Sequence, residues 1–224
     1  MLKARKRITK RQIKEDKFVT FYFKAQDYIK QNLNKVLIGL GAVLAVILIT
    51  TLILQSKRTA ELNASVKLAE ANSKLMRGEM QPAIDILLNM IEDYSGTQSA
   101  ARGIYLLAYS YYQKGEFENA EKYFRRYLDD YGDDPIQASA AYSGLAASLE
   151  QQKKFQDAAQ FYEKAAAKFS NHFNAPQQLM DAARCYKLVN RANDARRCYE
   201  KLIEKYPNSA LKNEAEAFLA VLKG

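Results

Sequence analysis

Tryptophan is absent from this chain of 224 residues, and histidine, cysteine, proline and glycine are scarce, with one, two, four and nine residues respectively. Few glycines and prolines favour long helices over a turn-rich sheet protein. The single histidine, His172, falls in a polar turn and is expected at the surface. No G-x-S-x-G, glycine-rich phosphate loop or Cys/His metal spacing occurs in the sequence. These absences predict an all-α protein that is not an enzyme and needs no metal or cofactor.

The net positive charge of the chain lies almost entirely in its N-terminal tail. Of the 34 Lys and Arg residues, 11 lie in residues 1–35 beside three acidic residues, whereas residues 36–224 hold 23 basic and 22 acidic residues. The remainder of the chain is thus almost neutral, so nucleic-acid binding is not expected. The tail is expected to act as a topology signal or to contact anionic lipid headgroups. Its basic residues include Lys3, Arg5, Lys6, Arg7, Lys10 and Arg11.

One uncharged run, Val36 to Ser56, separates this tail from the rest of the chain. Its 19-residue core, Val36 to Leu54, reads VLIGLGAVLAVILITTLIL. As a helix it spans roughly 28 Å, about the thickness of the hydrocarbon layer of a bilayer. The run predicts an uncleaved transmembrane anchor at residues 36–56, and the absence of a nearby cysteine argues against a lipoprotein. Basic residues that flank a span stay on the cytoplasmic side. We therefore expect a span in a bacterial inner membrane, with the N-terminus in the cytoplasm and residues 57–224 in the periplasm or extracellular space.

The segment before the anchor has apolar residues at helical spacing, namely Phe18, Tyr22, Ala25 and Ile29. An amphipathic helix there would lie along the inner membrane face or pack on a partner. The sequence does not separate these two alternatives.

Self-similarity within residues 60–222 predicts a stack of helix pairs. In the clearest block, Ala100 to Gly132, apolar residues fall on one face of a first helix, Gly115 ends that helix, and a second amphipathic helix follows. The apolar residues of the two helices are Ile104, Leu107, Ala108 and Tyr111, then Phe117, Ala120 and Phe124.

This block resembles the tetratricopeptide repeat (TPR) family, whose pattern is W-x2-L-G-x2-Y…A-x3-F…P, with Ile104 in place of the tryptophan. The alanines that mark four copies, Ala83, Ala120, Ala158 and Ala195, are spaced 37, 38 and 37 residues apart. The usual period is about 34 residues, and the longer spacing is similar to that of TPR proteins of the bacterial envelope. The resemblance implies an α-solenoid with repeats near 64–97, 101–134, 139–172 and 176–209, followed by a cap helix at 210–222.

TPR proteins commonly take a peptide or partner helix in a concave groove that the first helix of each pair lines. The resemblance therefore implies a partner-binding groove, and exposed Tyr and Arg are preferred contact residues. Two interpretations of its three tyrosines remain open, exposure in the groove or packing against the neighbouring helix. The predicted groove residues are Arg102, Tyr105, Tyr109, Tyr112, Gln113, Glu150, Met180, Arg184 and Lys187.

The two cysteines, Cys185 and Cys198, fall in the first and second helices of the fourth repeat. Antiparallel helices joined near Asn190 would bring them close, so the alternatives are ordinary internal packing and a disulfide in an oxidising compartment. A redox-catalytic role is not expected, because C-x-x-C is absent.

One N-terminal anchor followed by about four TPRs resembles the ancillary subunits that associate with the Sec translocon. The sequence thus predicts a membrane-tethered adaptor that binds protein partners and assists protein translocation or envelope protein folding. The alternative is a structural subunit of a larger envelope complex, whose anchor packs on partner helices through Gly39 and Gly41.

Overall fold

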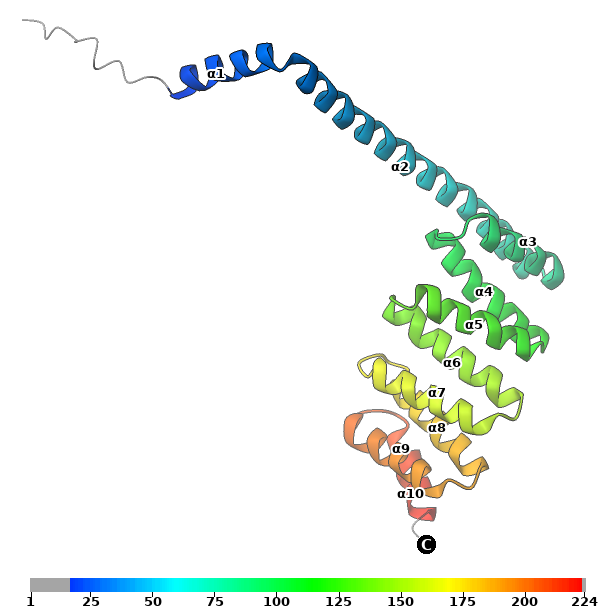
Figure 1. Cartoon of the computed structure of the whole chain (residues 1–224). Helices are drawn as coiled ribbons and strands as arrows, with labels where there is room; N and C mark the ends of the chain where they lie inside the picture. The colour runs from blue at the N-terminus through cyan, green and yellow to red at the C-terminus, as the bar shows by residue number, and fades with distance from the viewer. Residues whose placement is uncertain (1–16, 223–224) are drawn as a thin grey trace, which may run out of the picture. The chain divides into compact units, whose positions relative to one another are not determined.

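The computed structural model describes residues 17–222, which are helical and contain no β-strand. The chain divides into two compact units, Met1–Ser56 and Lys57–Gly224 (Figure 1). The basic residues from Lys3 to Arg11 lie outside the described residues, and their predicted lipid contact lies there too. The helices are α1 (Lys17–Gln31), α2 (Leu33–Met76), α3 (Met80–Asp93), α4 (Gln98–Lys114), α5 (Phe117–Tyr131), α6 (Pro135–Gln151), α7 (Phe155–Lys168), α8 (Ala175–Leu188), α9 (Ala192–Lys205) and α10 (Lys212–Val221).

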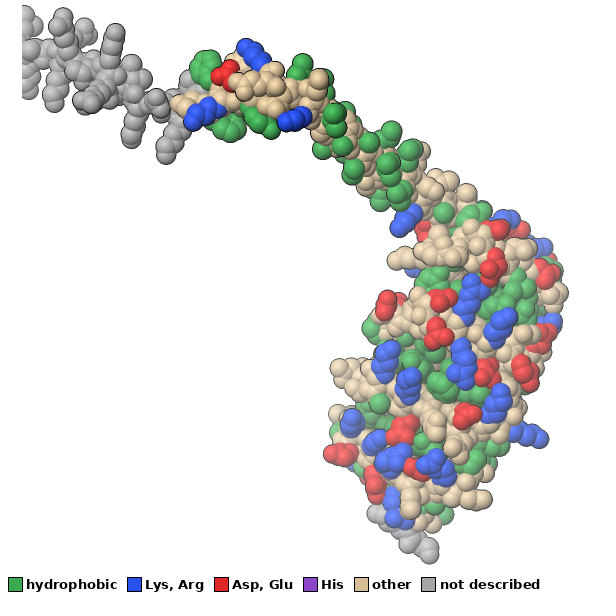
Figure 2. Space-filling model, in the orientation of Figure 1, with side chains coloured by type: hydrophobic (Ala, Val, Ile, Leu, Met, Phe, Trp, Pro, Cys, Tyr) green, Lys and Arg blue, Asp and Glu red, His purple; other side chains and the backbone are tan. Residues whose placement is uncertain are grey.

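The first unit consists of α1 and the N-terminal part of α2. α1 is a helix, as the apolar spacing predicts, and it leaves Phe21, Tyr22 and Tyr28 exposed. By length and composition, α2 is long and apolar enough to cross a membrane, and the apolar window is not buried by other residues of the protein. Apolar side chains cover this part of α2 in Figure 2, without charged side chains among them.

Two hydroxyl groups interrupt the apolar segment, and both bond to the helix itself. Thr50 Oγ1 donates to the carbonyl of Val46 at 2.7 Å, and Thr51 Oγ1 donates to that of Leu48 at 2.8 Å. Internal pairing is what a hydroxyl group in hydrocarbon requires, because no water is there to bond it. The segment is therefore chemically compatible with a lipid environment.

The second unit is a TPR-like solenoid of antiparallel helix pairs. Ala71 near the end of α2 shares a buried core with α3. The pairs α4 with α5, α6 with α7 and α8 with α9 follow, before α10 covers the last pair (Figure 1). Each helix from α3 onward packs on the next, and α4 also contacts α6. The marker alanines Ala83, Ala120, Ala158 and Ala195 are completely buried, so each second helix approaches its neighbours closely.

The turn within each pair uses one left-handed residue at an equivalent position. These residues are Gly78, Gly115, Lys153 and Asn190, with φ of 77°, 84°, 63° and 59°. Gly115 ends α4, as predicted, and its N–H bonds to the carbonyls of Tyr111 and Tyr112. Glycine adopts this conformation without steric cost, whereas a lysine does not. Two of the four turns therefore carry a local conformational cost.

Close helix contacts rest on two other glycines. A Cβ added to Gly144 of α6 would lie 2.3 Å from Cζ of Phe124, whose ring sits over this position. A Cβ on Gly103 of α4 would lie 2.0 Å from Cε of Met90. A larger residue at Gly144 would have to displace the Phe124 ring, whereas at Gly103 the flexible end of Met90 can move aside.

Helices α6 and α8 each have a proline at one of their first two positions, and their starts differ. Asp134 caps α6, accepting from the N–H groups of Ile136 and Gln137. Asn174 makes no side-chain cap for α8, because its backbone is already helical at φ −80° and ψ −11°, whereas a capping residue needs an extended backbone. Its N–H instead donates to Nδ1 of His172 at 3.4 Å. His172 lies in this turn, partly exposed and beside the ring of Phe173.

Candidate functional site

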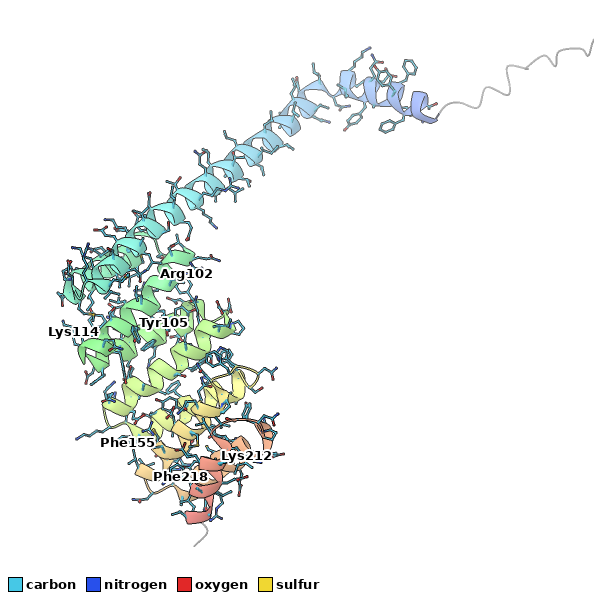
Figure 3. All side chains as sticks on the ribbon, turned by 180° about the vertical axis from the view of Figure 1, so that it is seen from behind. Arg102, Tyr105, Lys114, Phe155, Lys212 and Phe218 are labelled. Carbon is cyan, nitrogen blue, oxygen red and sulfur yellow. The ribbon has the colours of Figure 1, made fainter. Side chains whose placement is uncertain are left out.

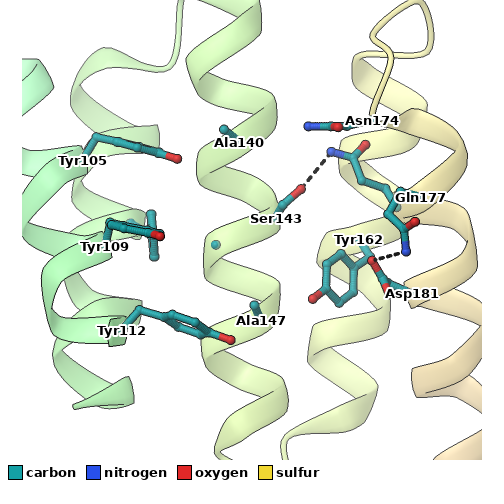
Figure 4. A pocket seen from close by; sticks show the side chains of 13 residues that line it. Tyr105, Tyr109, Tyr112, Ala140, Ser143, Ala147, Tyr162, Asn174, Gln177 and Asp181 are labelled. Carbon is teal, nitrogen blue, oxygen red and sulfur yellow. Dashed lines mark hydrogen bonds between the residues drawn. The ribbon is translucent and has the colours of Figure 1, made fainter. Parts of the chain in front are cut away.

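The first helices of three successive repeats line a groove with a volume of about 340 Å³. Three tyrosines of α4 stand on one side, small residues of α6 form the floor, and polar residues of α8 stand opposite (Figure 4). The phenylalanine and tyrosine that close the groove from below come from the second helices α5 and α7. The lining residues are Tyr105, Tyr109, Tyr112, Phe124, Ala140, Ser143, Gly144, Ala147, Tyr162, Asn174, Gln177, Gln178 and Asp181.

The three tyrosines of α4 do not all behave alike: two pack against neighbouring rings, and one is exposed in the groove. Tyr105 is half-buried, with its ring edge-on to Phe124 at 5.8 Å, and burial raises the pKa of its hydroxyl. Tyr112 packs edge-on against Phe117 at 5.5 Å. Tyr109 is 47% exposed, and its hydroxyl accepts a bond from Nε2 of Gln113 at 2.7 Å. The tyrosines therefore form a wall that is anchored at its ends and presents Tyr109 to the groove.

The floor of the groove is formed by small residues on one face of α6. Ala140, Ser143 and Ala147 repeat at intervals of three and four residues, so they follow one face of α6 (Figure 4). Small side chains leave the space that large residues would occupy. An incoming chain could thus lie close to the backbone of α6.

Gln178 joins the floor to the polar wall. Its side chain is 1% exposed, and Nε2 donates to the hydroxyl groups of Ser139 and Ser143 at 3.0 and 2.9 Å. Its Oε1 is buried and has no hydrogen-bond partner among the described residues. A buried amide oxygen without a partner costs free energy that a donated hydrogen bond would recover. Gln178 therefore lies beneath the groove surface, where it ties α8 to α6.

Arg184 and Glu150 bond to each other across adjacent repeats. Arg184 Nη1 and Nη2 both donate to the carboxylate of Glu150, and Nη2 also donates to Asp181 Oδ1 at 3.0 Å. The pKa of the Arg184 guanidinium is raised, chiefly by its hydrogen bond to Glu150. These two predicted groove residues therefore form an ion pair that joins α6 to α8.

The remaining predicted residues do not join the central groove. Arg102 lies one turn before Tyr105 on α4 (Figure 3) and lines a second hollow with Asp130 and the start of α6. Met180 is 8% exposed, so its side chain is mostly interior. Lys187 places its ammonium group 4.8 Å from the ring centre of Phe218 and lines a third hollow beside α10. The nine predicted residues thus divide among separate surfaces.

Sequence reasoning missed most of the polar wall. Asn174 directly precedes α8, and Gln177 and Asp181 lie in its first two turns, whereas the prediction for this repeat began at Met180. The repeats are rotated relative to one another, so equivalent positions do not face the same hollow. The amide and carboxylate groups that recur at intervals of three and four residues were the available signal.

Both cysteines are free and completely buried, so the structure has internal packing rather than the alternative of a disulfide. The Glu150 carboxylate of α6 acts on the Cys185 thiol, whereas the Glu163 carboxylate of α7 acts on the Cys198 thiol. The two thiols therefore have different surroundings rather than a shared one. Burial raises the pKa of each thiol to about 12, so ordinary internal packing is the correct interpretation.

Ion pairs also link the second helices along the outer layer. Glu163 of α7 accepts from Arg197 at 2.9 Å and from Lys201 at 2.6 Å on α9. Glu121 of α5 pairs in the same manner with Lys154, at 3.1 Å. Within residues 17–222, no group of three or more His, Cys, Asp or Glu side chains is placed to hold a metal ion.

Stacked antiparallel pairs with a groove along their first helices define the class of TPR-like helical repeat proteins. Solved structures agree on this fold. The structural alignment with MamA from Desulfovibrio magneticus RS-1 covers 71% of this chain and 85% of MamA, with a TM-score of 0.56 and 15% identity. A putative kinesin light chain from Podosopora anserina covers the same shares with a TM-score of 0.55 and 16% identity.

The family follows from sequence comparison. The model of the family described as YfiO, outer membrane lipoprotein, matches residues 61–224, so the chain belongs to this family. It is also similar to the chaperone protein SicA of Salmonella typhimurium, at 30% identity over 128 residues, which is 56% of this chain and 72% of SicA. The TPR-like helical repeat fold predicted from the alanine spacing is therefore confirmed.

Proposed function

We propose that this protein is a membrane-tethered adaptor that captures a peptide segment of a partner protein in the groove between α4 and α8. The observation that carries the proposal is a groove whose small-residue floor on α6 lies beside the exposed Tyr109. A peptide backbone would lie along the small-residue floor, while an apolar or aromatic side chain would stack on Tyr109. The similarity to SicA, a chaperone, supports a role in protein binding.

The tether is the apolar segment of α2. It is uncharged from residue 36 to residue 56, and the tail before it carries most of the net positive charge. Under this proposal the N-terminus lies in the cytoplasm and the solenoid on the far side of the inner membrane, in the periplasm or extracellular space. A lipid attached to cysteine is not the tether we propose, because both cysteines are buried in the solenoid.

The role we propose is assistance of protein translocation or of protein folding in the envelope. A tethered groove holds an emerging segment near the membrane and raises its local concentration there. The groove lining includes one charged residue, Asp181, and its carboxylate is neutralised by Arg184. We therefore expect apolar and uncharged segments to bind better than highly charged ones.

A structural subunit of a larger complex is the second candidate. Gly39 and Gly41 have no other side chain within 4 Å, so a partner helix would approach the backbone closely there. Replacing both glycines with leucine distinguishes the candidates. Loss of a stoichiometric membrane complex would favour the subunit, and unchanged peptide capture would favour the adaptor.

A photo-crosslinking amino acid at Tyr109 in the full-length protein tests the groove. A matched control carries the same amino acid at Lys122, which is exposed on α5 and does not line the groove. We expect discrete adducts at Tyr109 that disappear when Ser143→Arg fills the floor, and we expect no such adducts at Lys122. Equal adducts at both positions would refute the groove as the binding site.

A single introduced thiol tests the tether and its direction. Because Cys185 and Cys198 are buried, Lys122→Cys supplies the only exposed thiol within the described residues. A membrane-impermeant maleimide should label this variant in intact spheroplasts, whereas the wild type stays unlabelled. Labelling only after lysis would place the solenoid in the cytoplasm and overturn the proposed location.

A further inference from the structure

Beyond residue 57, α2 has apolar residues on two opposite faces. One face packs on the solenoid, where Ala64 and Ala71 are completely buried. The opposite face leaves Leu62, Val66 and Met76 exposed to 64%, 59% and 89% of their surface. The outer face of a terminal repeat is normally polar, because no neighbour covers it. This one is not.

The exposed residues follow a heptad spacing. Leu62, Val66, Ala69, Ser73 and Met76 are separated by four, three, four and three residues, and all five are exposed. Alternating intervals of three and four define the a and d positions of a coiled coil. Leu62, Ala69 and Met76 then occupy d, and Val66 and Ser73 occupy a. A β-branched residue at a with leucine at d favours a two-stranded parallel coiled coil.

The outer face of α2 beyond residue 57 is not suited to insertion into lipid. The same part of α2 carries Lys67 and Glu70, which form an exposed ion pair, and Lys74, which pairs with Glu79. Inserting charged groups of both signs into hydrocarbon is too costly for the few apolar residues between them. A protein helix with the same spacing covers the apolar positions and leaves these charges in water.

We propose that the outer face of α2 pairs with the same face of a second copy of this chain, in a parallel, in-register coiled coil. The positions that flank the stripe are Asn63, Ser65, Glu70 and Asn72, of which one is charged, so two identical helices meet no repeated like-charge contact. The pair buries Leu62, Val66 and Met76 against their own counterparts.

The parallel orientation rests on the proposed membrane tether, since copies with the same anchor enter the membrane in the same direction. The same spacing of four, three and four residues also occurs within the apolar segment, at Gly41, Ala45, Leu48 and Leu52. Small residues four apart are typical of membrane helices that pair closely. Two copies in one membrane also meet at a high effective concentration, which favours a short coiled coil.

Cysteine cross-linking of the full-length protein in membranes tests the pair. We expect copper-catalysed disulfide dimers from Val66→Cys and Ala69→Cys, several-fold more abundant than from Lys67→Cys and Glu70→Cys, which are exposed beside the stripe. The wild type is the background control, because its two thiols are buried. Equal dimer yields at all four positions, or no dimer, would overturn the proposal.

A mixture of Leu62→Cys and Met76→Cys chains tests the direction. A parallel pair gives little mixed dimer, whereas abundant mixed dimer with little Val66→Cys dimer would show an antiparallel pair and overturn the proposal. Carbonate extraction of the same membranes tests the tether separately. An extractable protein with the expected dimer pattern would refute the tether and leave the coiled coil standing.

Discussion

Glu61 lies in α2, yet its carboxylate completes the N-terminus of α4. Oε2 accepts from the N–H of Gln98 at 2.8 Å, and Oε1 accepts from the N–H and the hydroxyl of Ser99 at 3.2 and 2.7 Å. Thr97 accepts from the next N–H, that of Ala100, at 3.0 Å. The first three N–H groups of α4, which have no partner within the helix, are thus bonded to side chains.

We expect Glu61→Gln to destabilise the solenoid by about 1–2 kcal/mol at pH 7, because the positive end of the α4 dipole loses its negative partner and one acceptor becomes a donor. Partial exposure of Glu61 keeps the effect in this range rather than higher. For a domain of this size, that corresponds to a midpoint of thermal unfolding lower by roughly 3–6 °C.

The pH dependence of this difference has a defined sign. The pKa of the Glu61 carboxyl is lowered in the folded state, chiefly by its hydrogen bond to the Ser99 hydroxyl. A lowered pKa contributes stability that is fully present above the unfolded pKa of about 4.3 and is lost as the pH falls through the folded value. The difference between wild type and Glu61→Gln should therefore be constant from pH 7 to 5 and shrink below pH 4.5.

Thermal unfolding of the detergent-solubilised full chain, followed by circular dichroism at several pH values, measures this effect. Glu70→Gln is the matched control, because its ion pair with Lys67 is about half exposed and contributes little. The two variants should differ clearly at pH 7, and adding Ser99→Ala to Glu61→Gln should cost less than Ser99→Ala alone. Equal midpoints for the two glutamate variants, or a difference that persists undiminished at pH 3.5, would refute this account of the cap.

Three further predictions concern the solenoid. Lys153→Gly should raise stability by about 0.5 kcal/mol, since relief of the left-handed strain exceeds the added chain entropy; a lower unfolding midpoint would contradict it. Gly144→Ala should lower stability by about 1–3 kcal/mol in denaturant titrations, because its Cβ would meet the Phe124 ring, and a neutral result would show that the ring moves freely. Cys185 and Cys198, with pKa values raised by burial to about 12, should react with a maleimide at pH 8 only after unfolding in guanidinium; rapid labelling of the folded protein would argue against their burial.

The helix pairs and their period could be read from the sequence. The spacing of Ala83, Ala120, Ala158 and Ala195 predicts where second helices approach their partners, and Gly115 predicts the end of α4. These features depend on interactions over a few residues, namely helix periodicity, side-chain size and backbone freedom. Local rules of this kind hold in each repeat regardless of its neighbours.

The candidate site depended on contacts between repeats. The pairing of Arg184 with Glu150 and the cap that Glu61 supplies to Ser99 join residues more than 30 positions apart. Each depends on the rotation from one helix pair to the next, which repeat spacing does not specify. The same rotation directs Cys185 and Cys198 toward different carboxylates. It also places an unpaired amide oxygen of Gln178 beside the tyrosines of α4, because these groups meet only when three repeats stack.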